Sequence, residues 1–175
     1  MTVKADRSIL ILLPDKKRKN LEEFRKKHIK SEGREVPFHI TLLPDFYLPN
    51  ELNDNIISKL KLISNTFPKF DFKAVPISSF PTSKVIYLSP VPVGPIEQLV
   101  YKIKDLLPKY KDKERSAHIY HMTLAMGNPF DQTKEIIEDY FNKIGKEPLL
   151  LKAGKLAIYI KKQGKWSEYQ SFELS

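Results

Sequence analysis

The hydrophobic and polar positions in the first half of the chain alternate between strand-like and helix-like spacing. An apolar run predicts an opening strand, and Pro14-Asp15 ends this strand and begins a helix that should reach about Ser31. Asn50 is positioned to cap a second helix, in which apolar residues recur at helical spacing. The elements expected here are a strand at 8–13, a helix at 15–31, a strand at 36–43, a helix at 51–65 and a strand at 70–77.

The second half of the chain repeats this order. Its expected elements are a strand at 85–88, a helix at 95–107, a strand at 119–126, a helix at 130–144 and a strand at 149–151. The order strand-helix-strand-helix-strand thus occurs twice, with an offset of about 80 residues, which indicates an internal duplication. Residues 155–161 and 166–174 predict a closing hairpin. We therefore expect one bilobal domain over residues 1–175, with repeat units at about 8–77 and 84–153 and a hairpin at 155–174.

Each repeat carries one copy of a short motif on a predicted strand: His39-Ile40-Thr41-Leu42 and His121-Met122-Thr123-Leu124. Along a strand, residues i and i+2 project to the same face, so each histidine should lie beside its threonine while the apolar residues turn to the core. Random placement would give well under one such motif, on the order of a seventh. A two-fold relation between the repeats would bring both histidines to one groove, as in-line displacement at phosphorus requires.

Composition and charge narrow the possible partners. The chain has 175 residues, no cysteine and a formal net charge of +9, with 30 Lys and Arg against 21 Asp and Glu. The basic excess favours a polyanion such as RNA or a nucleotide. Part of it lies in the first predicted helix, in Lys16-Lys17-Arg18-Lys19 and Arg25-Lys26-Lys27, which we expect to form a solvated face. Because no disulfide is possible and no segment is typical of a leader or a membrane span, we expect a cytoplasmic protein.

Other ionisable residues are expected to be structural. Asp45 and Asp131 lie in turn or cap contexts without a histidine at ligand spacing, so the sequence predicts no metal site. His28 lies in the basic helix and should be solvated. His118 is three residues before His121, so in a regular strand it would point to the opposite face and would not join the histidine pair.

The motifs, their separation and the duplicated layout resemble the two-histidine (2H) phosphoesterase superfamily, which includes 2'-5' RNA ligase-like proteins and cyclic phosphodiesterases. Two further stretches resemble its small bacterial branch: Ser78-Ser79-Phe80-Pro81 leading into Val85–Leu88, and Trp166 followed by Tyr169–Leu174. The resemblance spans essentially the whole chain. It implies an α+β fold with two pseudo-symmetric lobes, each an antiparallel sheet flanked by helices, around a central groove.

The resemblance also implies roles for the motif residues. His39 would act as general acid and His121 as general base, while Thr41 and Thr123 would bind the non-bridging phosphate oxygens. The near symmetry of the motifs leaves the two histidine roles interchangeable on the residues alone. No cofactor is implied. Ser79, Phe80, Lys84 and Tyr87, between the two motifs, are candidate substrate-binding residues, through phosphate contacts or base stacking.

Two classes of function remain open on this basis. The first is a metal-independent phosphoesterase, expected to be monomeric, that hydrolyses cyclic phosphate or 2'-5' bonds of RNA ends or nucleotides, or runs the reverse ligation. The second is a non-catalytic module that holds an RNA end or a nucleotide in the same basic groove. A binder needs no titrating pair, so the presence of both histidines and both threonines favours the enzyme.

Overall fold

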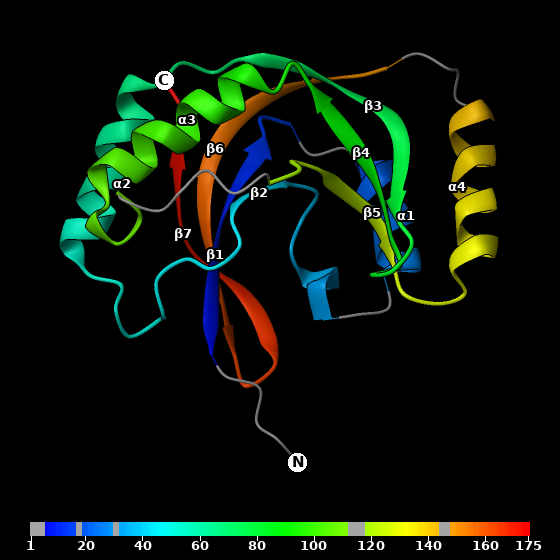
Figure 1. Ribbon diagram of the computed structural model, residues 1–175, viewed down its shortest axis with the longest axis horizontal. Helices are drawn as coiled ribbons and strands as arrows, with labels where there is room; N and C mark the ends of the chain where they lie inside the picture. The colour runs from blue at the N-terminus through cyan, green and yellow to red at the C-terminus, as the bar shows by residue number, and fades with distance from the viewer. Residues whose placement is uncertain (1–5, 17–18, 30–31, 112–117, 144–147) are drawn as a thin grey trace.

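The computed structural model describes residues 6–16, 19–29, 32–111, 118–143 and 148–175 (Figure 1). In chain order its elements are β1 (Arg7–Pro14), α1 (Lys19–His28), the 3₁₀ turn η1 (Glu32–Glu35), β2 (Ile40–Leu43), α2 (Asp54–Thr66), β3 (Asp71–Phe80), β4 (Val85–Val91), α3 (Gly94–Leu106), the 3₁₀ turn η2 (Pro108–Tyr110), β5 (Met122–Met126), α4 (Phe130–Lys143), β6 (Leu149–Lys162) and β7 (Lys165–Glu173). The predicted order of elements, strand-helix-strand-helix-strand twice and then a hairpin, is confirmed.

The order of the strands in the sheet is symmetric. Six strands lie in the order β2-β1-β6-β3-β4-β5, every neighbouring pair is antiparallel, and β7 pairs with β6. Reversing this order exchanges β2 with β5, β1 with β4 and β6 with β3, which are the equivalent strands of the two repeats. The third strand of each predicted repeat therefore pairs with the first strand of the other: β6 with β1, and β3 with β4.

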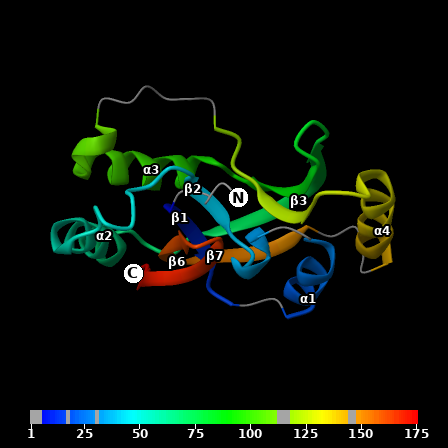
Figure 2. The ribbon, with the colours of Figure 1, turned by 90° about the horizontal axis from the view of Figure 1, so that it is seen from below.

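The helices are also paired between the two halves of the chain. Figures 1 and 2 show α2 beside α3 at one end of the molecule and α1 beside α4 at the other. The ring centroids of Phe24 in α1 and Tyr140 in α4 lie 4.7 Å apart. Each pair thus joins one helix from each repeat, and the two pairs lie on either side of the strands.

A continuous core joins the strands to the helices. The apolar faces of α2 and α3 bury Leu60, Ile96 and Ile103 completely, together with Leu10 of β1 and Ile158 of β6. Burial of one such side chain contributes roughly 1.5–3 kcal/mol, so these contacts hold the helical faces against the strands. A smaller cluster around Ile11, Tyr159 and Trp166 packs against the other face of the β1–β6 pair.

Two helices begin later than the sequence predicts. The first prediction began at Asp15, but the backbone N–H of Asp15 donates to the Lys152 carbonyl at 2.7 Å, which ties this residue to β6, and α1 begins at Lys19. The helix ends at His28, and its predicted end at Ser31, like Lys17 and Arg18 of the basic run, lies outside the described residues. The sequence predicts Asn50 as the cap of the second helix and residue 51 as its start, but α2 begins at Asp54.

The cap of α2 is Asn53, whose side-chain oxygen accepts hydrogen bonds from the backbone N–H groups of Asn55 and Ile56. Asparagine is strongly favoured at this position, and the sequence offers two asparagines three residues apart, so only the backbone path decides between them. The last predicted helix ended at Ile144, which lies outside the described residues; α4 is described to Lys143.

The strands differ from their predictions at several points, and β3 and β4 both end three residues later than predicted, at Phe80 and Val91. The strand expected at 149–151 and the first hairpin strand are one continuous strand, β6, which pairs with β1, β3 and β7 in turn. The two motif strands are shorter than predicted, because β2 begins at Ile40 and β5 at Met122. Each motif histidine therefore lies immediately before its strand.

Candidate active site

The two motifs lie on β2 and β5, the strands at the two ends of the sheet order. The imidazole Nε2 of His118, just before β5, lies 3.2 Å from the carbonyl oxygen of Thr41 in β2. The apolar motif residues Ile40, Leu42, Met122 and Leu124 are all 2% exposed or less. The expected alternation is therefore confirmed at these positions, and it directs Thr41 and Thr123, which lie on the strands, away from the core.

Both motif histidines are anchored through the same ring nitrogen. His39 Nδ1 lies 2.5 Å from the carbonyl oxygen of Pro37, and His121 Nδ1 lies 2.8 Å from that of Ile119, in each case two residues earlier in the chain. A carbonyl accepts only, so Nδ1 carries the proton and donates it. In the neutral ring Nε2 is then the basic nitrogen. The two repeats thus present equivalent imidazoles in one tautomer.

In the first motif the threonine side chain lies beside its histidine, as the sequence predicts. The Thr41 hydroxyl lies 3.1 Å from His39 Nε2 and donates to it when the ring is neutral. Thr123 occupies the equivalent position of the second motif on β5 and pairs across the sheet with Tyr87 on β4. Both threonines are partly exposed.

The surroundings keep both imidazoles uncharged at neutral pH. Burial is the main cause that lowers the pKa of His39 to about 3, and the positive charge of Arg25 and the neighbouring His121 lower it further. Burial also lowers the pKa of His121, with a contribution from His118. Desolvation disfavours the imidazolium in both cases, and each Nδ1 hydrogen bond opposes this effect.

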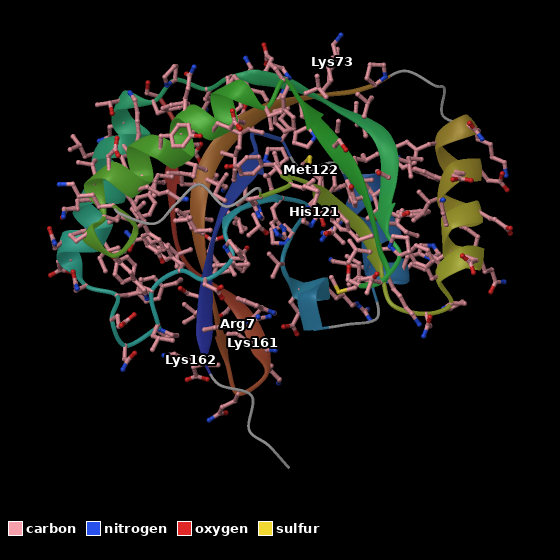
Figure 3. The ribbon with its side chains drawn as sticks, viewed as in Figure 1. Arg7, Lys73, His121, Met122, Lys161 and Lys162 are labelled. Carbon is pink, nitrogen blue, oxygen red and sulfur yellow. The ribbon has the colours of Figure 1, made fainter. Side chains whose placement is uncertain are left out.

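Two of the four predicted substrate-binding residues lie next to His121, which Figure 3 shows where β5 begins. The ring centroid of Phe80 is 5.3 Å from that of His121 in an edge arrangement, and that of Tyr87 is 5.2 Å away. Phe80 and Tyr87 also stack on each other, with centroids 4.4 Å apart. Together the rings form an aromatic wall on one side of this imidazole.

The other two predicted substrate-binding residues are placed differently. The Lys84 ammonium donates to the Asn128 side chain at 2.7 Å, in the turn between β3 and β4. Ser79 pairs with Ile86, whereas Ser78 pairs with Tyr87. Strand alternation therefore places Ser79 on the face opposite Phe80, and Ser78 shares the face of the aromatic wall.

One prediction about a histidine is wrong. His118 was expected to face away from His121, but their ring centroids lie 6.5 Å apart. The expectation assumed regular strand geometry, and β5 begins only at Met122, so residues 118–121 do not alternate as strand residues do.

Arg25 is a further residue of the site, although its place in the basic helix predicted a solvated side chain. Its side chain is 2% exposed, and its Nε donates to the carbonyl oxygen of Thr123 at 2.8 Å. The sequence held one indication of this: Arg25 lies four residues after Leu21 and four before Ile29, the spacing typical of one helix face, and all three side chains are buried.

No metal cluster or membrane-spanning helix is found in the described part of the chain. Among those residues, no group of three or more His, Cys, Asp and Glu side chains could hold a metal ion. None of the helices described for this chain has the length and apolar character needed to cross a membrane.

Comparison with known proteins shows to which superfamily this chain belongs. A sequence model of the 2'-5' RNA ligase superfamily matches residues 13–165. The chain therefore belongs to this superfamily, which is the 2H phosphoesterase class that its two motifs resemble. No match was found among curated proteins.

Solved structures share the fold. E. coli LigT complexed with 3'-AMP matches with a TM-score of 0.55 at 15% identity, over 98% of this chain and 99% of LigT. E. coli LigT complexed with NADP+ gives a TM-score of 0.55 at 14% identity, over 98% and 99% of the two chains. TT0787 of Thermus thermophilus gives a TM-score of 0.62 at 17% identity, over 96% and 97%. The expected α+β, 2H phosphoesterase-like fold is thus confirmed.

Proposed function

We propose that this protein is a metal-independent phosphoesterase that hydrolyses cyclic phosphate or 2'-5' phosphodiester bonds of RNA ends or nucleotides. The observation that carries the proposal is the equivalence of the two imidazoles. His39 and His121 each use Nδ1 for a backbone carbonyl two residues earlier, which leaves Nε2 for proton transfer. Two such groups meet the need of in-line displacement for a base on one side of phosphorus and an acid on the other. Both come from one chain, so the proposed site is complete in a monomer.

The reaction follows from these positions. Nε2 of one neutral imidazole accepts a proton from water as the water oxygen bonds to phosphorus. The bond from phosphorus to a ribose oxygen breaks, and the other imidazole, protonated at Nε2, gives its proton to that oxygen. Thr41 and Thr123 would donate hydrogen bonds to the non-bridging oxygens, where negative charge develops. The aromatic wall of Phe80 and Tyr87 would contact the sugar or base beside His121.

The electrostatics place the same requirement on whichever histidine is the acid. The family resemblance assigns the acid to His39, yet burial and Arg25 hold the pKa of His39 at about 3, so this ring is neutral in the free protein. The assignment therefore requires that the negative charge of bound substrate raise the pKa of His39. The reverse assignment requires the same of His121, whose pKa is also lowered by burial.

The proposal is tested by turnover of a panel in the presence of EDTA: nucleoside 2',3'-cyclic phosphates, 2'-5'-linked dinucleotides and ADP-ribose cyclic phosphate. We expect at least one compound to be hydrolysed at a rate that EDTA leaves unchanged. His39→Ala and His121→Ala should each lower kcat by about 10² to 10⁴, the usual contribution of general acid–base catalysis. His28→Ala, which removes a histidine from α1, is the matched control and should keep the wild-type rate.

The alternative function is a module that binds an RNA end or nucleotide without turnover. The net charge of +9 favours it, but the neutral imidazoles do not, because an uncharged ring adds little attraction for an anion. Binding of the panel compounds without hydrolysis, unchanged in both histidine variants, would establish this alternative. Activity that EDTA abolishes and a divalent ion restores would instead require a metal-dependent mechanism.

A further inference from the structure

Arg25, in α1, makes hydrogen bonds to backbone within the second motif and just before the first motif. Its Nε donates to the carbonyl oxygen of Thr123 at 2.8 Å, within the second motif. One terminal nitrogen donates to the carbonyl oxygen of Val36 at 3.2 Å, three residues before the first motif histidine. The guanidinium also lies 5.7 Å from the ring centroid of Phe38. The rigid fork of one arginine thus fixes backbone from both repeats.

Glu22, one turn earlier in α1, completes this arrangement. Its Oε2 accepts from Arg25 at 3.0 Å, and its Oε1 accepts from the backbone N–H of Phe38 at 2.6 Å. The carboxylate therefore neutralises the buried guanidinium and holds the residue that directly precedes His39. A buried ion pair with all these hydrogen bonds supplies geometric definition more than net stability.

We infer that Arg25, oriented by Glu22, is a positioning residue that sets the placement of the two catalytic motifs relative to each other. The inference rests on the proposed function, because it assigns a role within that site. Arg25 touches neither reacting group: it acts on the backbone of Thr123 and on the segment that leads into His39. A displacement of about 1 Å at reacting groups lowers a rate by about 10²-fold, so the separation of the motifs has to be held closely.

The charge of Arg25 gives the inference a second readout. The positive charges that face His39 are Arg25 from α1 and, when protonated, His121 from the segment before β5, while the Glu22 carboxylate lies beside Phe38. Removal of the guanidinium should therefore raise the pKa of His39 from about 3 toward its ordinary value of 6.5. A residue with a purely structural role elsewhere in α1 would leave this titration unchanged.

The experiment compares Arg25→Lys, Arg25→Met and Glu22→Gln with wild type. Turnover gives kcat and KM, and NMR titration of the imidazole signals, assigned with His39→Asn, gives the pKa of His39. Lys26→Met is the matched control, because it removes one exposed positive charge from the same helix. It should change neither readout.

Each variant has a distinct expected result. Arg25→Lys keeps the charge but lacks the fork, so kcat should fall by about 10²-fold while the pKa of His39 stays low. Arg25→Met should lower kcat at least as much and raise the pKa of His39. Glu22→Gln keeps an acceptor for the backbone N–H of Phe38 and should lower kcat less than either.

Three results would overturn the inference. The first is an Arg25→Lys variant with wild-type kcat. The second is a folded Arg25→Met variant in which the pKa of His39 is unchanged. If Arg25→Met fails to fold, Arg25→Lys and Glu22→Gln still decide the question. The third is an equal loss of activity in Lys26→Met, which would show that kcat reports the charge of the helix and not the contacts of Arg25.

Failure of the proposed function is distinguishable from failure of this inference. If wild type hydrolyses nothing on the panel, the phosphoesterase proposal fails. Inorganic phosphate then replaces the substrate as the probe: it should shift the NMR signals of both His39 and His121 in wild type, with weaker binding in Arg25→Lys. Equal phosphate affinity in wild type and Arg25→Lys would end the positioning role as well.

Discussion

The lowered pKa of His39 predicts a specific dependence of stability on pH. In the folded protein this ring has a pKa of about 3, against 6.5 for an ordinary histidine and hence for the unfolded chain. As the pH falls below 6.5 the unfolded state binds a proton at His39 and the folded state does not. Protonation therefore favours unfolding, and the free energy of unfolding should decrease from pH 6.5 down to about pH 3.

The magnitude follows from the two pKa values. The full effect is on the order of 5 kcal/mol, and up to about 3 kcal/mol of it falls between pH 7 and pH 4. His39→Asn keeps an N–H donor for the Pro37 carbonyl and does not titrate. The free energy of unfolding of wild type should thus decrease between these pH values by up to about 3 kcal/mol more than that of His39→Asn.

Urea denaturation of both proteins at pH 7 and pH 4 measures this difference. Ile40→Val is the matched control: it deletes one fully buried methyl group in the same motif and introduces no titrating group. It should cost about 0.5–1.5 kcal/mol at both pH values. If the wild-type and His39→Asn curves run parallel within about 0.5 kcal/mol, the depressed pKa of His39 and the burial argument behind it are wrong.

Two further predictions concern the motif pair and a tight backbone contact. The double variant His39→Ala/His121→Ala should lose much less activity than the product of the two single losses, because the two imidazoles act as one unit; strictly multiplicative losses in kcat would contradict this. Gly154→Ala should lower the thermal unfolding temperature, since an added Cβ would lie 2.4 Å from the Cα atom of Asp15, and backbone cannot move aside as a side chain can. Gly94→Ala, with open space around the added methyl group, is the control, and an equal decrease there would remove the argument from close contact.

Features that depend on neighbouring residues could be predicted from the sequence. The alternation in each motif predicts that Ile40 and Met122 turn into the core, and both are completely buried. Hydrophobic periodicity predicts the order of the elements, which is confirmed over both repeats. The motifs themselves indicated the superfamily, because two histidine-threonine pairs on predicted strands are unlikely by chance.

The ends of helices and strands could be predicted less well from the sequence, because they depend on partners far along the chain. The start of α1 depends on a hydrogen bond between Asp15 and Lys152, and nothing in the local sequence of Asp15 indicates that bond. The choice of Asn53 over Asn50 as the cap of α2 depends on the path of the preceding backbone. Such ends are set by pairing and packing, which override local preference.

The assembly of the site depends on contacts that form only in the folded chain. The repeats exchange their third strands, so the order of the sheet could not be obtained from the order of the elements. His118 approaches His121 because β5 begins only after both of them. Arg25 bonds to a carbonyl 98 residues away, and neither its residue type nor its place in a basic helix indicates that partner. Local patterns determine which face a side chain occupies, whereas contacts between distant segments exist only once the chain has closed around its core.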